Sequence, residues 1–301
     1  MSDSKVKSGE PFIREDLLDI VRYIKKKRMF LGIHTNATLL NTKIIKELKA
    51  VLSEVDVIQV SIDGSTYEIN RKMRMVSKAQ HDLILNNCGL LVEKGINVKV
   101  NATITNHNVH DMVNIYSLLV DIGVNEISFS SVFLMRNSMH YTFMPEAEEI
   151  LNAFVKVLIK SEEKGHPIPI VQDPIAVPYG DSNLISIYKS IPDLASFYCP
   201  AGISAIEVDE KGNVFPCPFL RNENFLAGNL LKTTLPQLWK KKNTWDIFRN
   251  KQTSTDLDCP DCHFSSICKG GCAAQSFELF NNTDCADPRC DLAKNWRYKY
   301  V

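Results

Sequence analysis

The sequence predicts an α/β protein in which parallel β/α units, arranged as an open sheet or a barrel, precede a small cysteine-rich domain. Two observations lead to this expectation. From about residue 12 to 135, short β-branched runs alternate with amphipathic helical patterns. From about residue 197 onward, short segments, turns and cysteines replace that alternation.

The individual elements follow from apolar periodicity and from residues that begin or end helices. A short apolar run predicts a strand at 30–35, a run rich in β-branched residues predicts one at 55–62, and further strands are expected at 97–104 and 127–133. Apolar residues at helical spacing predict helices at 14–28, 42–53, 81–94, 108–121 and 147–164. Asn41 is a candidate N-cap, and Gly95 and Gly123 each follow a helix end. Four prolines within 166–179 indicate a linker or an irregular cover.

Charge and hydropathy exclude several classes of protein. Lysine plus arginine and aspartate plus glutamate number 35 each, so no basic stripe predicts a nucleic-acid partner. The polar start lacks the apolar core of a signal peptide, and no 18-residue apolar run predicts a membrane span. We therefore expect a cytoplasmic protein, in which nine cysteines do not form a disulfide framework.

The cysteines predict a metal-binding region. Eight of the nine lie in the last 103 residues, at Cys199, Cys217, Cys259, Cys262, Cys268, Cys272, Cys285 and Cys290. Two ligands on one tight turn, as in the Cys-x2-Cys at 259–262, are a typical start of a metal site. Zinc fits this spacing, but eight thiols without a histidine pair favour two iron–sulfur clusters. The Gly270-Gly271 pair also lets the backbone approach a bulky inorganic centre.

Several other residues have packing in the core as their expected or alternative role. Cys88 lies in a helical run with Ile84 and Leu91, which predicts a packed thiol. His34 faces a cofactor or simply lines the sheet. Met73 and Met75 are expected to contribute to packing.

At its C-terminal part the chain resembles radical S-adenosylmethionine (SAM) enzymes with a SPASM/twitch extension. Cys199-x12-Gly212-x4-Cys217, the four cysteines from 259 to 272, and Asp287-Pro288-Arg289-Cys290 match the SPASM signature. Gly228-Asn229-Leu230 and Leu235-x3-Trp239 resemble the usual link between its two halves. The family includes peptide maturases and proteins that modify haem or other cofactors.

The resemblance continues through residues 8 to about 135. Ser8-Gly9-Glu10-Pro11 looks like the Gly-Gly-Glu-Pro turn that meets the amino group of S-adenosylmethionine. Thr35-Asn36-Ala37 and Ser61-Ile62-Asp63-Gly64 resemble the motifs that end the next two strands. The resemblance implies that Gly9, Glu10, Ser61 and Arg74 bind the cofactor, Ser61 at the ribose and Arg74 at the carboxylate. The implied fold is a partial parallel β/α barrel of radical SAM type over residues 1–190, with a SPASM domain over 191–301.

The resemblance also divides the cysteines between two auxiliary [4Fe–4S] clusters. Cys259, Cys262, Cys268 and Cys290 would bind the outer cluster, and Cys199, Cys217 and Cys272 the inner one. Cys285 is a candidate fourth ligand of the inner cluster, and an open iron site for substrate is the alternative. Pro218 stands where sulfatase maturases carry an aspartate, which argues against sulfatase maturation.

One expected motif is missing. Radical SAM enzymes hold the reductive cluster with Cys-x3-Cys-x2-Cys, and no such triplet occurs in this sequence. The seven largely polar residues before Ser8 predict no strand there. We expect the first β/α unit to be absent, because the chain is a fragment of a longer protein. The alternative is a non-catalytic paralogue.

The implied function is that of a radical SAM/SPASM oxidoreductase or maturase. A 5′-deoxyadenosyl radical would abstract hydrogen from a peptide or cofactor precursor, with a donor such as ferredoxin or flavodoxin supplying electrons. No catalytic residue is assigned. An electron-transfer or non-catalytic iron–sulfur protein and a zinc-stabilised binding module are the other two hypotheses. Neither nucleic acid nor membrane is an expected partner.

Overall fold

The computed structural model describes residues 3–6, 9–133, 143–165, 170–171, 199–250 and 269–290. The chain divides into two compact units, of which unit 1 comprises Met1–Val132 and Phe143–Gln172. Unit 2 comprises Phe133–Thr142 and Asp173–Val301. The boundary expected at 190/191 lies outside the described residues and stays a prediction.

Unit 1 is an α/β partial barrel, as the sequence predicted. Its described strands form a six-stranded parallel sheet in chain order. They are β1 (Asp3–Val6), β2 (Phe30–Thr35), β3 (Val57–Ser61), β4 (Val98–Ile104), β5 (Glu126–Ser131) and β6 (Ile170–Val171). The helices are α1 (Leu17–Lys26), α2 (Thr42–Val51), α3 (Tyr67–Arg74), α4 (Lys78–Glu93), α5 (Met112–Ile122) and α6 (Ala147–Lys164), with short 3-10 turns η1 (Pro11–Ile13) and η2 (Val109–Asp111).

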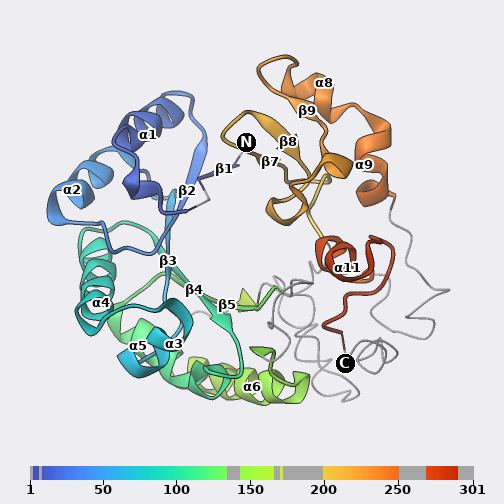
Figure 1. Cartoon of the computed structure of the whole chain (residues 1–301). Helices are drawn as coiled ribbons and strands as arrows, with labels where there is room; N and C mark the ends of the chain where they lie inside the picture. The colour runs from blue at the N-terminus through green and yellow to red at the C-terminus, as the bar shows by residue number, and fades with distance from the viewer. Residues whose placement is uncertain are drawn as a thin grey trace. The chain divides into compact units, whose positions relative to one another are not determined.

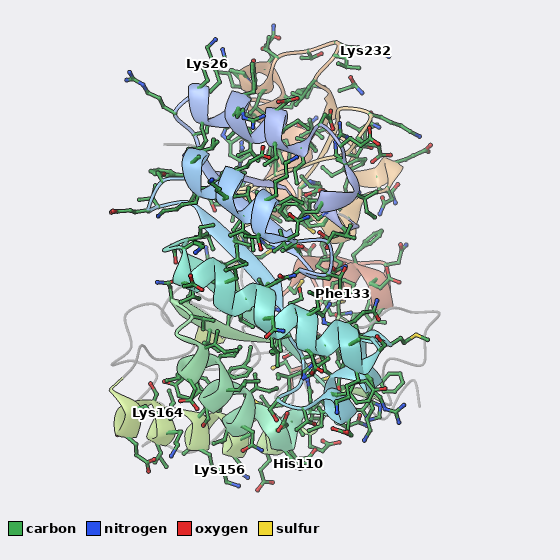
Figure 2. The ribbon with its side chains drawn as sticks, turned by 90° about the vertical axis from the view of Figure 1, so that its left-hand side faces the viewer. Lys26, His110, Phe133, Lys156, Lys164 and Lys232 are labelled. Atoms are coloured by element: carbon green, nitrogen blue, oxygen red, sulfur yellow. The ribbon has the colours of Figure 1, made fainter. Side chains whose placement is uncertain are left out.

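The helices form an outer layer over one face of the curved sheet (Figure 1). Figure 2 looks onto this layer, from α1, which ends at Lys26, to α6, which carries Lys156 and Lys164. Neighbours in this layer pack in chain order, with α1 against α2, α2 against α4, α4 against α5 and α5 against α6. Short connections between successive strands and helices place them side by side in this way.

Burial alternates along the central strands, and this alternation gives the sheet two different faces. Ile33, Val60 and Val100 are fully buried on the face that the helices cover. On the other face of the sheet, the half-buried His34 pairs in register with Gln59. In a parallel sheet packed on both sides, both faces are normally apolar. The polar face therefore suits contact with polar molecules.

Two elements of unit 1 contradict the expectations from sequence. We expected no strand before Ser8, but β1 pairs with β2 from Asp3↔Phe30 to Val6↔Ile33. The strand β1 pairs with β2 through backbone hydrogen bonds, which any residue can make. The polar side chains of β1 therefore do not show the apolar pattern by which a strand is predicted. The basic stretch at 67–74 forms α3 behind the N-cap Thr66, and Asn70 is its one buried residue. Such a polar helix lacks the apolar periodicity that marks the others.

Unit 2 contains a small antiparallel sheet and short helices. The described strands β7 (Glu207–Val208), β8 (Asn213–Phe215) and β9 (Gly228–Asn229) pair in that order. The described helices are α8 (Leu235–Trp239), α9 (Lys242–Arg249) and α11 (Ala273–Phe280), and η6 (Pro218–Leu220) and η7 (Glu223–Phe225) are 3-10 turns.

The Gly-Asn link of the sequence has a packing reason in unit 2. Gly228 has φ +148°, and a Cβ atom there would lie 2.6 Å from Leu238 Cδ2. Leu238 belongs to α8 and packs with Val214 and Trp245 in a buried cluster. Only glycine lets β9 pass this close to α8, so the motif supports the core of unit 2.

None of the described helices is both long enough and apolar enough to span a bilayer.

Candidate functional site

The first two strand-end motifs of unit 1 form one hydrogen-bonded unit. Glu10 follows Gly9, whose φ of +60° turns the chain after β1. Thr35 Oγ1 donates to Glu10 Oε1 at 2.6 Å, and the Asn36 N–H donates to Glu10 Oε2 at 2.8 Å. The Phe12 N–H adds a 3.3 Å contact. The carboxylate of Glu10 is therefore held in place at the carboxyl end of β2.

A buried ion pair lies after the next strand. Arg74 Nε of α3 is 2.7 Å from Asp63 Oδ2, and the two side chains are 26% and 4% exposed. Among the described residues Arg74 Nε has no well-directed hydrogen bond, so this contact is mainly electrostatic. The Thr103 N–H donates to Asp63 Oδ1 at 2.8 Å. Burial raises the pKa of Asp63 above its ordinary value, although the charge of Arg74 and the Thr103 N–H oppose the shift.

These groups border a cavity of about 460 Å³ at the carboxyl ends of β2, β3 and β4. Asn36, Asp63 and Thr103 line it from the strand ends. Met73, Arg74 and Met75 line it from the side of α3. Met75 is 92% exposed, so the expectation that it contributes to packing is wrong. Its backbone ends α3 in the left-handed conformation, which turns the side chain away from the core.

The four residues predicted to bind the cofactor differ in their position relative to the cavity. Arg74 lines the cavity, and Glu10 is bonded to Asn36, which lines it. Among the described residues that line the cavity, neither Gly9 nor Ser61 occurs. Ser61 ends β3 in register with Asn101, on the polar face. The role of all four as cofactor ligands stays a prediction.

The cavity fits a molecule with the polar groups of S-adenosylmethionine. Its volume falls in the range of about 300–1,000 Å³ typical of small-molecule sites. A guanidinium suits a carboxylate, and a fixed carboxylate suits an ammonium group. Sequence reasoning missed Asp63, Asn36 and Thr103 as lining residues. The first two lie inside motifs that the sequence shows, but the contribution of Thr103 depends on strand register.

In unit 2, three cysteines from separate segments come together. Cys199, Cys217 and Cys272 all pack against the cluster of Ala201, Leu220, Phe225, Phe248, Ala273 and Ala274. Burial raises the pKa of Cys217 and of Cys272 to about 12, and the nearby Cys199 adds to the shift of both. All three thiols pack on the same apolar cluster, and Cys199 lies close enough to influence the other two. They are the three cysteines expected to bind the inner cluster, an assignment that stays a prediction.

The chemistry of these three side chains suits an iron–sulfur cluster, because cysteine thiolates are its usual ligands. In the described part of the chain, no three His, Cys, Asp or Glu side chains are grouped closely enough to hold one metal ion. A cubane binds each thiolate through a different iron, so its ligand sulfurs stand further apart. A buried thiol with a raised pKa loses its proton when a metal centre supplies the compensating charge. The donor set therefore fits an iron–sulfur cluster.

Two of the other cysteines are connected to Cys272 through the hydrogen bonds of Ser276 and Asp287. Cys285 and Cys290 belong to the segment after α11, where Ser276 Oγ donates to the Cys285 carbonyl at 2.8 Å. Cys259, Cys262 and Cys268 fall outside the described residues. Cys88 is fully buried in α4 of unit 1, where burial raises its pKa to about 12, as expected of a packed thiol.

Two family models match the chain and define its class. The Radical SAM superfamily matches residues 6–119, and SPASM, an iron–sulfur cluster-binding domain, matches residues 199–263. The chain is thus a member of the Radical SAM superfamily with a C-terminal SPASM domain.

Similar proteins differ in what they make. The chain is 23% identical over 299 residues to the AdoMet-dependent heme synthase of Nitratidesulfovibrio vulgaris, covering 94% of this chain and 77% of that protein. It is 26% identical over 291 residues to the mycofactocin maturase MftC of Mycobacterium tuberculosis, covering 94% and 68%. SuiB of Streptococcus suis, solved with S-adenosylmethionine, shares the fold with a TM-score of 0.71 at 16% identity. That match covers 95% of this chain and 65% of SuiB.

Proposed function

We propose that the protein is a radical SAM/SPASM oxidoreductase or maturase that modifies a peptide or a cofactor precursor. The observation that carries the proposal is that one chain contains both a candidate cofactor site and a candidate cluster site. Unit 1 has a strand-end cavity bordered by Arg74 and Asp63, and unit 2 has the three neighbouring thiols of Cys199, Cys217 and Cys272. A radical reaction of this class needs both a cofactor site and auxiliary clusters.

Four residues at or near the strand ends have a defined task in this proposal. When bound and reduced by one electron from a reductive iron–sulfur cluster, S-adenosylmethionine would release methionine and supply a 5′-deoxyadenosyl radical for abstraction of a substrate hydrogen. Arg74, oriented by Asp63, binds the cofactor carboxylate through its terminal nitrogens. Glu10, held by Thr35 and Asn36, accepts hydrogen bonds from the ammonium group. Ser61 binds the ribose, and Gly9 gives the turn that places Glu10.

The cysteines of the last hundred residues hold two auxiliary [4Fe–4S] clusters in the proposal. Cys199, Cys217 and Cys272 bind the inner cluster, with Cys285 or substrate at its fourth iron. Cys259, Cys262, Cys268 and Cys290 bind the outer cluster. These clusters pass electrons out of the site or anchor the substrate.

Formation of the radical requires a Cys-x3-Cys-x2-Cys loop, which these 301 residues do not contain. The proposal therefore requires that the triplet be encoded upstream of Ser8 in a longer protein. Genomic sequence in frame with this chain tests the requirement. An upstream stop codon without the triplet would favour the alternative, a non-catalytic or electron-transfer iron–sulfur protein.

Relatives support two substrate classes. MftC is a maturase, and SuiB has also been solved bound to its precursor peptide SuiA, which favours a peptide. The similarity to a heme synthase favours a cofactor precursor. A ferredoxin or flavodoxin is the proposed electron donor.

The deciding experiment is anaerobic reconstitution of this chain with iron and sulfide. Two clusters predict about eight iron and eight sulfide per chain and a brown protein. A colourless protein that binds zinc instead would contradict the proposal. Cleavage of S-adenosylmethionine by the longer protein, measured as 5′-deoxyadenosine released, separates the enzyme from the electron-transfer alternative.

A further inference from the structure

A buried ion pair lies beside Cys272 in unit 2. Arg289 Nε donates to Asp287 Oδ1 at 3.0 Å, and Arg289 Nη2 donates to Asp287 Oδ2 at 2.9 Å. The two residues are 3% and 1% exposed. Removing two charges from water is costly unless their geometry and hydrogen bonds compensate, so such a pair requires an explanation.

The carboxylate of this pair also binds the backbone of a predicted cluster ligand. The Cys272 N–H donates to Asp287 Oδ2 at 3.0 Å, the same oxygen that receives Arg289 Nη2. Cys272 is the residue before α11, so this bond fixes where the helix begins. Asp287 Oδ2 therefore bridges the Arg289 guanidinium and the Cys272 N–H, because it accepts a hydrogen bond from each.

The same segment fixes a second predicted ligand. The Asp287 N–H donates to the Gly270 carbonyl at 2.8 Å, and the Cys290 N–H donates to the Asp287 carbonyl at 2.9 Å. The second bond closes a β-turn with Pro288 at its second position, where proline favours the turn. Asp287 thus holds the backbone of Cys272 through its side chain and that of Cys290 through its main chain.

Gly271 and Asp287 lie too close together for any side chain at position 271. Gly271 has φ +77°, and a Cβ atom there would lie 2.5 Å from Asp287 Cβ. Glycine is therefore required for Asp287 to reach the Cys272 N–H. The Gly-Gly pair allows the approach of this carboxylate, in addition to any role beside a cluster.

We propose that Asp287, held in place by Arg289, is a positioning residue that sets the backbone of Cys272 and Cys290, ligands of different auxiliary clusters, and that Arg289 balances the charge of its carboxylate beside the inner cluster. The inference rests on the proposed function, because it requires the two clusters. Groups that orient metal ligands commonly change metal affinity by about 10- to 100-fold when they are removed. A nearby positive charge also stabilises the more negative, reduced form of a cluster.

The test compares variants of the reconstituted chain in three measurements: iron and sulfide per chain, loss of iron to a chelator, and a redox titration followed by EPR. The variants are Asp287→Asn, Arg289→Lys, Arg289→Gln and the double variant Asp287→Asn/Arg289→Gln. The matched control is Asp209→Asn. Asp209 accepts from the N–H groups of Lys211 and Asn213 in the β7–β8 turn, and none of its side-chain hydrogen bonds among the described residues involves a cysteine. Loss of signal in Cys217→Ser identifies the inner cluster.

We expect Asp287→Asn to lose iron to the chelator about 10- to 100-fold faster than the wild type, with Asp209→Asn unchanged. Arg289→Lys retains the charge and should keep the inner midpoint potential near that of the wild type. Arg289→Gln should shift the potential to more negative values. The double variant also removes the carboxylate that is bonded to the Cys272 N–H, so its inner midpoint potential should lie above that of Arg289→Gln.

Two outcomes would overturn the inference while leaving the proposed function intact. One is a wild type with both clusters and variants whose iron retention and potentials match it. The other is an iron loss in Asp209→Asn equal to that in Asp287→Asn. A wild type that binds no iron would instead overturn the proposed function, and the inference with it.

Discussion

Arg74 shows how a single side chain is prepared for a ligand. Its Nε contacts Asp63, and Asp63 in turn receives the Thr103 N–H. The planar guanidinium is therefore oriented from one edge, which leaves its terminal nitrogens for a partner in the cavity. The family resemblance implied Arg74 as a cofactor-binding residue, an assignment that stays a prediction. Its buried partner was not identified, because Asp63 and Arg74 are joined only when α3 folds back over the end of β3.

Replacing Arg74 by alanine should weaken binding of S-adenosylhomocysteine, which carries the same carboxylate as the cofactor. Loss of a charge-assisted hydrogen bond of about 1.5–3 kcal/mol corresponds to roughly 10- to 100-fold in Kd. Isothermal titration calorimetry measures the change. Lys72→Ala removes the same charge from an exposed position of α3 and should bind like the wild type. Equal affinities for the two variants would contradict the assignment of Arg74.

Gly271→Ala should destabilise unit 2 more than a comparable glycine substitution. At both Gly271 and Gly212 the φ angle is positive, +77° and +80°, so an alanine at either costs about 1 kcal/mol in backbone strain. At Gly212 the nearest side-chain atom is 3.5 Å from the added Cβ, an ordinary contact. At Gly271 the overlap with Asp287 should raise the loss to about 3 kcal/mol. Thermal unfolding of the two variants gives the difference, and similar melting temperatures would contradict the crowding argument.

At the scale of elements, one carboxylate joins α1, β2 and the loop before β3. Asp56 is fully buried, and it lies 2.7 Å from Lys25 Nζ and accepts the Leu31 N–H at 2.8 Å. The N–H and hydroxyl of Ser53 each donate to it at 2.7 Å. These bonds fix the ends of three elements at the amino-terminal edge of the sheet. Their place is opposite to the cavity, so the network serves stability.

Asp56→Asn should destabilise unit 1 by about 3 kcal/mol, because buried donors lose a charged acceptor. Asp19→Asn removes an exposed partner of Arg22 and should cost less than about 0.5 kcal/mol. Urea unfolding at pH 7 measures both changes. A loss for Asp56→Asn as small as that for Asp19→Asn would contradict the structural role.

The same residue predicts a pH dependence. Burial alone would raise the pKa of Asp56, but Lys25, Ser53 and Leu31 outweigh it and hold the pKa below its ordinary value. A depressed pKa stabilises the folded state at pH values above the unfolded-state pKa of about 3.9. That contribution is lost as the pH falls through the folded-state pKa. The stability difference between wild type and Asp56→Asn should therefore shrink below about pH 4, and a constant difference from pH 6 to pH 3 would contradict this.

Across the whole molecule, the two units have separate cores and separate candidate sites. We therefore expect two thermal transitions in the metal-free chain. Reconstitution with iron and sulfide should raise the transition of unit 2 by about 10 °C or more, because ligation stabilises only the folded state. Calorimetry before and after reconstitution measures the shift. Cys88→Ala should leave the iron content unchanged, and Cys217→Ser should lower it. An iron-dependent shift of the unit 1 transition alone would contradict the placement of the clusters.

The sequence by itself determined the class of fold and the type of chemistry. Periodicity marked the helices and strands whose apolar face is buried, with 30–35 and 147–164 matching β2 and α6 in full. Spacing predicted that the thiols are metal ligands, and this assignment stays a prediction. Both signals are local, because each repeats over a few residues of chain.

Only the tertiary structure decided which distant groups meet. It formed β1 and α3 from polar segments, joined Asp63 to Arg74, and brought Cys199 and Cys217 to Cys272. It also placed Asp287 against the backbone of Cys272. Such contacts depend on strand register and on the crossing of remote segments, and their free energy comes from burial and from hydrogen bonds between them. A pattern within a short stretch of sequence predicts neither the strand register nor the crossing of remote segments.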